Sequence, residues 1–263
     1  MARVHAAFSV LFLALFAGPT IQPGWTQAST NPSSPSPVTA ATVLSGASRA
    51  FSNGVPIHGV TLTGTANWIA GSDNESGNVT LVANADGSYQ INLELGQSSR
   101  IETQTAFAQG QQCTWSGSDS VAHAVATHNC LLSVAWFMPG VALFGNQQPQ
   151  GVTTVFAGNS ASGQSPGLDL RQQQIAQSGS SADMATLFSH LTSIDIHYDP
   201  TTYLPISLSY NVHPDENAAQ DIPVEVIFSN YHKVSGITVP YRIQRFVNGV
   251  LSLDITISGV SIS

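Results

Sequence analysis

The fold class is decided by a stretch near the end of the chain, Leu204–Val212, whose sequence is LPISLSYNV. Every second position in it is apolar, namely Leu204, Ile206, Leu208, Tyr210 and Val212. A period of two places one face of an extended strand in a core and the other face in water. The stretch therefore predicts a half-buried β-strand.

The same alternation recurs along most of the chain. It predicts strands at His58–Ile69, Val79–Ala83, Tyr89–Leu95, Ile101–Phe107, Ile194–Tyr198, Val224–Phe228 and Leu251–Ile257. Asp86-Gly87 and Asn248-Gly249 are tight-hairpin signals, because glycine readily adopts the positive φ such turns require. Gly259 stands where the apolar parity changes and predicts a β-bulge. At least eight antiparallel strands are expected.

The middle of the chain has a different pattern. The nearly continuous apolar run Asn129–Phe144 predicts a short buried helix broken at Pro139. Ser181–Leu191 predicts a second helix with Ser181 as its N-cap. Two short strands are expected around a loop at Gly158–Gly167. The sequence thus predicts an α+β domain, with helices over the apolar face of a strongly curved antiparallel sheet.

The N-terminus predicts export. Residues 1–28 have the layout of a signal peptide: Arg3, the apolar run Ala6–Gly18, and a small-x-small site ending at Ala28. About a dozen apolar residues are too few to span a bilayer, and no later stretch is long enough. Cleavage near Ala28 would leave a periplasmic or extracellular chain. Residues 29–50 are expected to be a Ser/Pro-rich flexible linker, and residues 51–263 a single β domain.

The charge balance excludes two classes of partner. The chain has 15 Asp and Glu against 7 Lys and Arg, and Lys233 is its one lysine. It cannot build the basic surface that phosphate backbones or anionic membranes attract, so no nucleic-acid partner is expected.

The two cysteines, Cys113 and Cys130, are expected to form a structural disulfide, since an even pair in an exported chain most simply does so. The alternative is a thiol pair for metal or redox chemistry, but the spacing fits neither a CxxC motif nor a zinc knuckle.

Two C-terminal segments resemble a known family. Tyr198–Pro205, YDPTTYLP, is similar to the strand-turn-strand "YDPxTxLP" of bacterial LolA/LolB-like envelope proteins. Phe228–Pro240, FSNYHKVSGITVP, resembles the "FSDYRxVxGxxVP" of that group. The resemblance covers residues 194–263 and is faint over a variable middle, residues 113–180. It implies a half or incomplete β-barrel with one or two helices over its concave face, where the founding members bind acyl chains and ferry lipoproteins across the periplasm.

The candidate ligand-binding residues are apolar. The candidate cavity is lined by Trp115, Trp136, Phe137, Phe144, Phe188 and Leu93. The default interpretation of the aromatic residues is that they fill the core under the helices.

Other candidate sites have simpler interpretations. His123 and His128 are five residues apart with no glutamate after the first, unlike a zinc-protease helix. The segment with His213, Asp215 and Glu216 is interpreted as an exposed turn. Asp195, His197 and Asp199 alternate and are interpreted as a solvated strand face. No nucleophile elbow or phosphate loop occurs. No catalytic residue, metal site or cofactor is therefore predicted.

Three function classes follow. The first is an exported, non-enzymatic carrier or sensor that holds an apolar or lipid-like ligand in the half-barrel. The second is an envelope module with a self-filled core that binds a protein partner through a strand edge or the Gln/Ser-rich insert. An enzyme of unrecognised type is the third.

Overall fold

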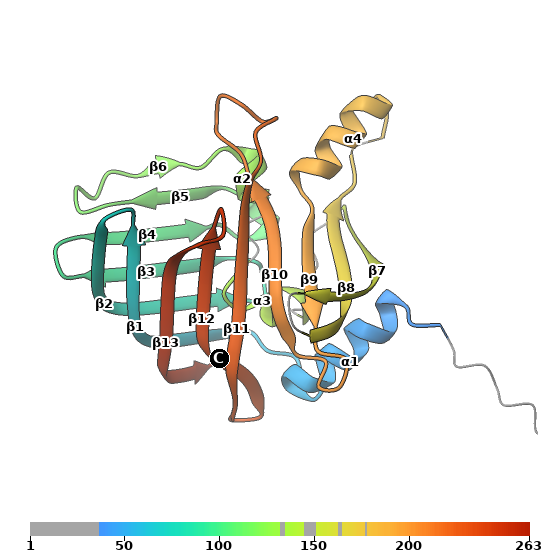
Figure 1. The fold of residues 1–263 in the computed structure, drawn as a ribbon, viewed down its shortest axis with the longest axis horizontal. Coiled ribbons are helices and arrows are strands. Elements are labelled where there is room, and N and C mark those ends of the chain that lie inside the picture. The colour runs from blue at the N-terminus through green and yellow to red at the C-terminus, as the bar shows by residue number, and fades with distance from the viewer. Residues whose placement is uncertain (1–36, 132–134, 145–150, 163–164, 177) are drawn as a thin grey trace, which may run out of the picture. The chain divides into compact units, whose positions relative to one another are not determined.

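The computed structural model describes residues 37–131, 135–144, 151–162, 165–176 and 178–263, and the folded unit begins at Val38. Its centre is one antiparallel sheet of 13 strands (Figure 1). The strands are β1 Gly59–Ala70, β2 Asp73–Asn84, β3 Tyr89–Leu95, β4 Ser99–Gln104, β5 Cys113–Ser116, β6 His123–Ala124, β7 Val152–Ser162, β8 Ser165–Gln174, β9 Ile194–Tyr198, β10 Pro205–Val212, β11 Ile222–Val234, β12 Ile237–Val247 and β13 Val250–Ile262. The helices are α1 Ala40–Ser52, α2 Thr127–Leu131, α3 Pro139–Phe144 and α4 Ala182–Leu191, with a short 3-10 turn at Phe107–Gln109.

The first and last strands are neighbours in this sheet. The spatial order is β6-β5-β4-β3-β2-β1-β13-β12-β11-β10-β9-β8-β7, so every other neighbouring pair is consecutive in sequence. The two ends of the sheet, β6 and β7, therefore come from the middle of the chain. The predicted α+β class with a strongly curved antiparallel sheet is confirmed.

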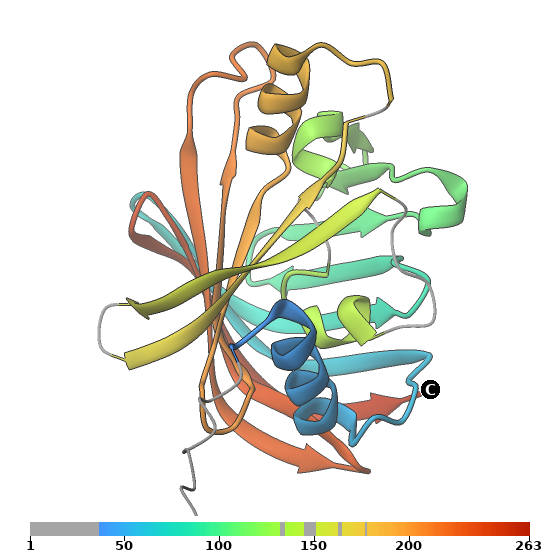
Figure 2. The ribbon, with the colours of Figure 1, turned by 90° about the vertical axis from the view of Figure 1, so that its right-hand side faces the viewer.

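Helices α1 and α3 cover the concave face of the sheet (Figure 2). Helix α1 begins at its N-cap Thr39, whose hydroxyl accepts a hydrogen bond from the Thr42 amide, and it buries Val43, Ala47 and Phe51. A Cβ on Gly140 would lie 2.8 Å from the Phe51 ring, so glycine lets α3 approach α1. The predicted linker is wrong for residues 40–50, because the apolar residues of this segment repeat at helical spacing and pack on the core.

The predicted turns and bulge are confirmed. Gly87 has a positive φ of 86°. Asn248 and Gly249 have φ 51° and 73°, the two positive values that a type I′ hairpin requires. The register of β1 on β13 shifts by one residue between Thr63 and Gly64, opposite Gly259. This shift is the bulge that the parity change indicates.

The middle of the chain differs from the prediction. Pro139 begins helix α3 instead of breaking one, because a proline at the first helical position lacks only an amide that would have no helical partner there. The strands β7 and β8 extend through most of the predicted loop, with Gly158 paired to Asp169. Helix α4 starts after Ser181 as predicted, but its apolar Met184 and Leu187 are exposed.

The predicted disulfide is present. Cys113 of β5 is bonded to Cys130 of α2, with Cα atoms 5.4 Å apart. The bond holds α2 against the edge of the sheet that β5 and β6 form. None of the helices in the described part of the chain is long and apolar enough to cross a membrane.

The burial of α1 gives a stability prediction. Phe51→Ala should lower the free energy of unfolding by about 3 kcal/mol or more, because it opens a cavity between α1, α3 and the sheet. Urea denaturation followed by circular dichroism measures this. Val55→Ala, at a residue 62% exposed just after the helix, is the control and should change it by less than about 0.5 kcal/mol. A Phe51→Ala variant as stable as the parent would mean that α1 does not pack on the sheet.

Candidate functional site

The strand registers bring charged residues onto the concave face. Arg100 and Glu102 of β4 lie opposite Leu93 and Ile91 of β3, both of which belong to the core. Directly opposed residues of an antiparallel pair project to the same face. At this end of the sheet the concave face is therefore polar, whereas the end covered by α1 and α3 is apolar.

A cavity of about 300 Å³ lies over this polar end. Its lining combines aromatic rings, two arginines and two carboxylates: Tyr89, Arg100, Glu102, Cys113, Thr114, Trp115, Ala124, Val125, Ala126, Asn129, Trp136, Tyr210, Val212, Asp215 and Arg245. The volume is at the lower end of the range of small-molecule pockets, roughly 300–1,000 Å³. We call it the concave cavity.

Aromatic rings and guanidinium groups alternate in a row whose members, except Trp68, line the cavity. The carbon of the Arg100 guanidinium lies 4.7 Å from the ring centroid of Trp115 and 5.5 Å from that of Trp68. The same carbon of Arg245 lies 5.5 Å from Trp68 and 5.2 Å from Trp136. Each cation–π contact contributes about 0.5–2 kcal/mol, depending on how far it is removed from water. We call these five residues the cation–aromatic row.

The two arginines of the row differ in their ion pairs. Arg100 donates from Nε to Glu102 at 2.6 Å, which neutralises its charge locally. Among the described residues the guanidinium of Arg245 has no carboxylate partner. The one hydrogen bond that it donates there, from Nε to the Ser252 hydroxyl, is long at 3.5 Å. A guanidinium has five N–H donors, so most of those on Arg245 are available to a ligand.

Tyr210 completes the polar side of the cavity. Burial raises the pKa of its phenol to about 12; the nearby Arg245 lowers it and Glu102 raises it. The phenol is therefore neutral over the whole physiological range and can both donate and accept a hydrogen bond.

The predicted ligand-binding residues fall into four groups. Trp115 and Trp136 line the concave cavity. Leu93 and Phe137 are fully buried in the core, and Phe137 packs edge-on against Trp136 with centroids 5.7 Å apart. Phe188 lies on α4 and lines none of the cavities described here. Phe144 ends α3, and its side chain lies outside the described residues.

The pocket described at Phe51, Met138 and Tyr198, where α1 and α3 meet the sheet, has a volume of only about 20 Å³. That volume is about one water molecule and cannot hold an acyl chain.

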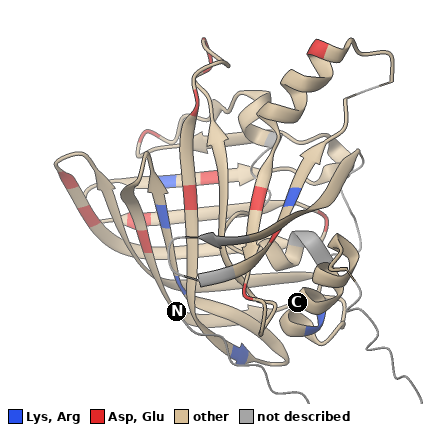
Figure 3. Ribbon diagram, turned by 45° about the vertical axis from the view of Figure 1, so that its right-hand side comes forward, with Lys and Arg blue, Asp and Glu red and all other residues tan. Residues whose placement is uncertain are grey.

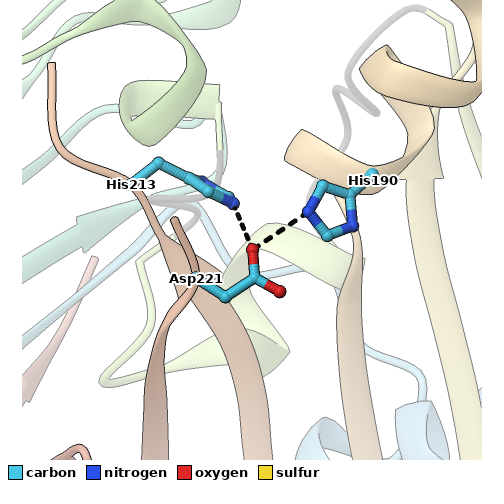
Figure 4. Close-up of side chains that lie close together, drawn as sticks. All are labelled: His190, His213 and Asp221. Carbon is cyan, nitrogen blue, oxygen red and sulfur yellow. Dashed lines mark hydrogen bonds and ion pairs between the residues drawn. The ribbon is translucent and has the colours of Figure 1, made fainter. Parts of the chain in front are cut away.

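A second group of polar residues lies where α4 meets the ends of β10 and β11. The Nε2 atoms of His190 and His213 each lie 3.0 Å from Oδ1 of Asp221 (Figure 4). The interpretation of residues 213–216 as an exposed turn holds for Asp215 and Glu216 but is wrong for His213, which is buried.

The interpretation of a solvated strand face is also wrong for one residue. Asp195 is partly exposed and forms a two-bond ion pair with Arg171 at 2.7 and 2.9 Å. His197 is buried and its Nδ1 lies 2.5 Å from Oδ1 of Asp169, a residue of the neighbouring strand. The side chain of Asp199 accepts from the Thr201 and Thr202 amides, and these bonds lower the pKa of its carboxyl.

A wider groove of about 500 Å³ lies beside these residues and includes Arg171, His190, Asp195 and Glu225 in its lining. Its one arginine is the partner of Asp195, so the groove offers no cation without a carboxylate partner. Figure 3 marks the few Lys and Arg positions along the ribbon of the described residues.

Arg245 is not among the residues predicted from the sequence, although its place in the alternating pattern of β12 indicates a core-facing charge. Ile237, Val239 and Ile243 share a parity in β12, and two residues further the same parity reaches Arg245. A charged residue at a core-facing position is a common mark of a binding site. The His190–Asp221 contact had no such signal, because its residues are 31 positions apart and on different elements.

The fold is shared with solved structures of very different sequence. An outer membrane lipoprotein-sorting protein domain from Vibrio parahaemolyticus matches 84% of this chain and 91% of its own, with 8% identity and a TM-score of 0.52. A DUF1329 family protein from Desulfovibrio piger matches 85% of this chain and 93% of its own, with 10% identity and a TM-score of 0.51. A LolA superfamily protein from Nitrosomonas europaea matches with 10% identity and a TM-score of 0.48 over 86% and 94% of the two chains.

These likenesses concern the fold. No family model matches the sequence, and no curated protein matches it. The chain has a LolA-like fold, as the resemblance of its C-terminal segments predicts.

The high pKa of Tyr210 predicts a loss of stability in alkali. The phenol of the unfolded chain ionises near pH 10, whereas the folded phenol keeps its proton to about pH 12. The folded state therefore binds more protons above pH 10, and its stability falls as the pH rises from 10 to 12. Urea midpoints measured at intervals over this range should fall less steeply for Tyr210→Phe than for the parent. Identical slopes would mean that Tyr210 ionises as readily in the folded chain as in the unfolded one.

Proposed function

We propose that this protein is an exported, non-enzymatic binding protein that holds an amphiphile with an acidic head group in the concave cavity. The observation that carries the proposal is Arg245, a partly buried cation that lines this cavity and has no carboxylate partner among the described residues.

The acidic head group follows from the chemistry of Arg245. Its guanidinium is held between the rings of Trp68 and Trp136, which fix its position but do not satisfy its N–H donors. A planar guanidinium binds carboxylate or phosphate through two parallel hydrogen bonds. The two carboxylates of the cavity lining compete only weakly with a ligand for Arg245, because Glu102 is bonded to Arg100 and Asp215 is exposed to water.

The apolar body follows from the rest of the lining. The rings of Trp115, Trp136 and Tyr89 border the same cavity, and indole and phenol rings bind aliphatic or aromatic groups. The ligand would lie in the concave cavity, since the pocket described beneath α1 has a volume of only about 20 Å³.

Export is part of the proposal. A signal peptide removed near Ala28 would send the chain out of the cytoplasm, and a disulfide persists in such oxidising compartments. The LolA-like fold, shared with a lipoprotein-sorting protein domain, supports a lipid-like ligand.

Tryptophan fluorescence tests this proposal directly. The sequence contains four tryptophans, Trp25, Trp68, Trp115 and Trp136. With the signal peptide removed, all three that remain belong to the cation–aromatic row, so their emission reports on this site alone. Titration of the mature chain with dodecanoate below its micelle concentration should give a saturable change at one ligand per chain.

Two arginines of one strand provide a matched pair of variants. Arg245→Gln should weaken dodecanoate binding by about 10-fold to 100-fold, the equivalent of one charged hydrogen-bonding contact. Arg242→Gln, three residues away on β12, removes an exposed arginine paired with Asp254 and should leave binding unchanged. Dodecanol, which lacks the acid, should bind the parent at least about 10-fold more weakly. Equal binding of dodecanoate by the Arg245→Gln variant and the parent would contradict the proposal.

A second function has its own observation. The strand β7 is an edge strand of 11 residues that pairs only with β8 among the described residues, and this edge favours a protein-interaction module. Such an edge can accept a strand from another protein. A photo-crosslinking residue at Val155, which is 47% exposed on β7, should then capture one partner in the native envelope, and the same residue at exposed Val121 should not. Equal labelling at both positions would argue against this function.

A further inference from the structure

Three side chains from three separate elements converge at the end of the sheet near α4. His190 lies in the last turn of α4, His213 follows β10, and Asp221 precedes β11. Both imidazole Nε2 atoms lie 3.0 Å from Oδ1 of Asp221, and all three candidate ligand atoms lie within 4.8 Å of one another (Figure 4).

We propose that His190, His213 and Asp221 bind one divalent transition-metal ion of the zinc type. Two imidazoles and a carboxylate are a donor set that Zn²⁺ and its first-row neighbours prefer, whereas Ca²⁺ and Mg²⁺ prefer oxygen donors throughout. Zinc bonds of roughly 2.0–2.1 Å at a tetrahedral angle place ligand atoms about 3.3 Å apart. The two observed nitrogen–oxygen separations of 3.0 Å need a small expansion to admit the ion, and the two Nε2 atoms, which lie within 4.8 Å of each other, are close enough to bind the same ion after a modest adjustment.

The backbone at His213 is held in place before any ion binds. The side-chain amide of Asn129 donates to the His213 carbonyl at 2.7 Å, and the His213 amide donates to Oδ1 of Asn129 at 2.9 Å. The residue after Asn129 is Cys130, which the disulfide joins to β5. Outer contacts that fix a ligand in this way raise metal affinity, because less order must be imposed on binding.

The cluster is also open to solvent on one side. The side chain of His213 is fully buried, whereas those of His190 and Asp221 are 45% and 43% exposed. An ion can therefore enter, and water can occupy the remaining coordination position. The ring of His128 lies 5.8 Å from that of His213. Its Nε2 atom is buried with no hydrogen-bond partner among the described residues, so His128 is a further candidate ligand for the ion.

The ion would join α4 to the hairpin of β10 and β11. Leu191 is the one buried residue of α4, and the apolar Met184 and Leu187 are exposed, so few contacts hold this helix. A bond from His190 through the ion to His213 and Asp221 would anchor its C-terminal end. The site does not depend on the concave cavity or its ligand.

The test uses the untagged mature chain, stripped with EDTA and dialysed, because a histidine tag would itself bind zinc. Isothermal titration with ZnCl₂ should give one site per chain. At zinc concentrations about 100-fold above the dissociation constant, the melting temperature should rise by roughly 5 °C or more. Substitution with Co²⁺ should give the visible absorption bands of a four-coordinate or five-coordinate nitrogen and oxygen site, and Ca²⁺ should have no effect.

Variants locate the ion. His190→Ala and Asp221→Asn change exposed side chains, so the fold should survive and zinc binding should fall by at least about 10-fold in each. His58→Ala, at an exposed histidine outside the cluster, is the control and should bind as the parent does. Zinc binding that survives both cluster variants, or a folded parent that binds no zinc, would overturn the proposal and leave Asp221 as a simple hydrogen-bond acceptor for two imidazoles.

Discussion

The pairing of β1 with β13 is the constraint on which the rest of the structure depends. Because the first and last strands of the folded unit are neighbours, the two free edges of the sheet fall in the middle of the sequence, at β6 and β7. The segment between these edges contains α2 and α3 and supplies Trp136, Phe137 and Met138 to the concave interior. The disulfide and the Asn129 contacts hold the start of that segment against the sheet.

This arrangement divides the concave face into two parts. Under α1 and α3 buried apolar residues form the core that stabilises the fold, and the pocket described there has a volume of only about 20 Å³. Beyond these helices the same face carries Arg100, Glu102 and Arg245. Burying these charges is tolerated because Glu102 pairs with Arg100 and tryptophan rings contact both guanidiniums. In the part of the chain that the structure describes, the charge of Arg245 has no carboxylate partner, and this is the feature that function best explains.

Much of the fold could be predicted from the sequence, because strands with one buried face show a strict period of two. Tyr89–Leu95 and Leu251–Ile257 are of this kind. Prediction failed where small and polar residues dominate a segment that nevertheless packs on the core. The Ser/Ala-rich segment of α1 resembles a linker, yet Val43 and Ala47 are buried by helical spacing. The site was harder still, since β4 has polar residues on both faces and the contact of His190 with Asp221 arises only from tertiary folding.

The central claim is that the concave cavity holds an acidic amphiphile through Arg245. The most direct measurement is mass spectrometry of an organic extract of the mature protein, purified without detergent from its native exported fraction, for the parent and Arg245→Gln side by side. The extract of the parent should contain an acidic amphiphile at about one molecule per chain, and the extract of the Arg245→Gln variant should contain much less of it. A clean extract from a folded parent, or equal amounts of the same molecule from both proteins, would contradict the central claim.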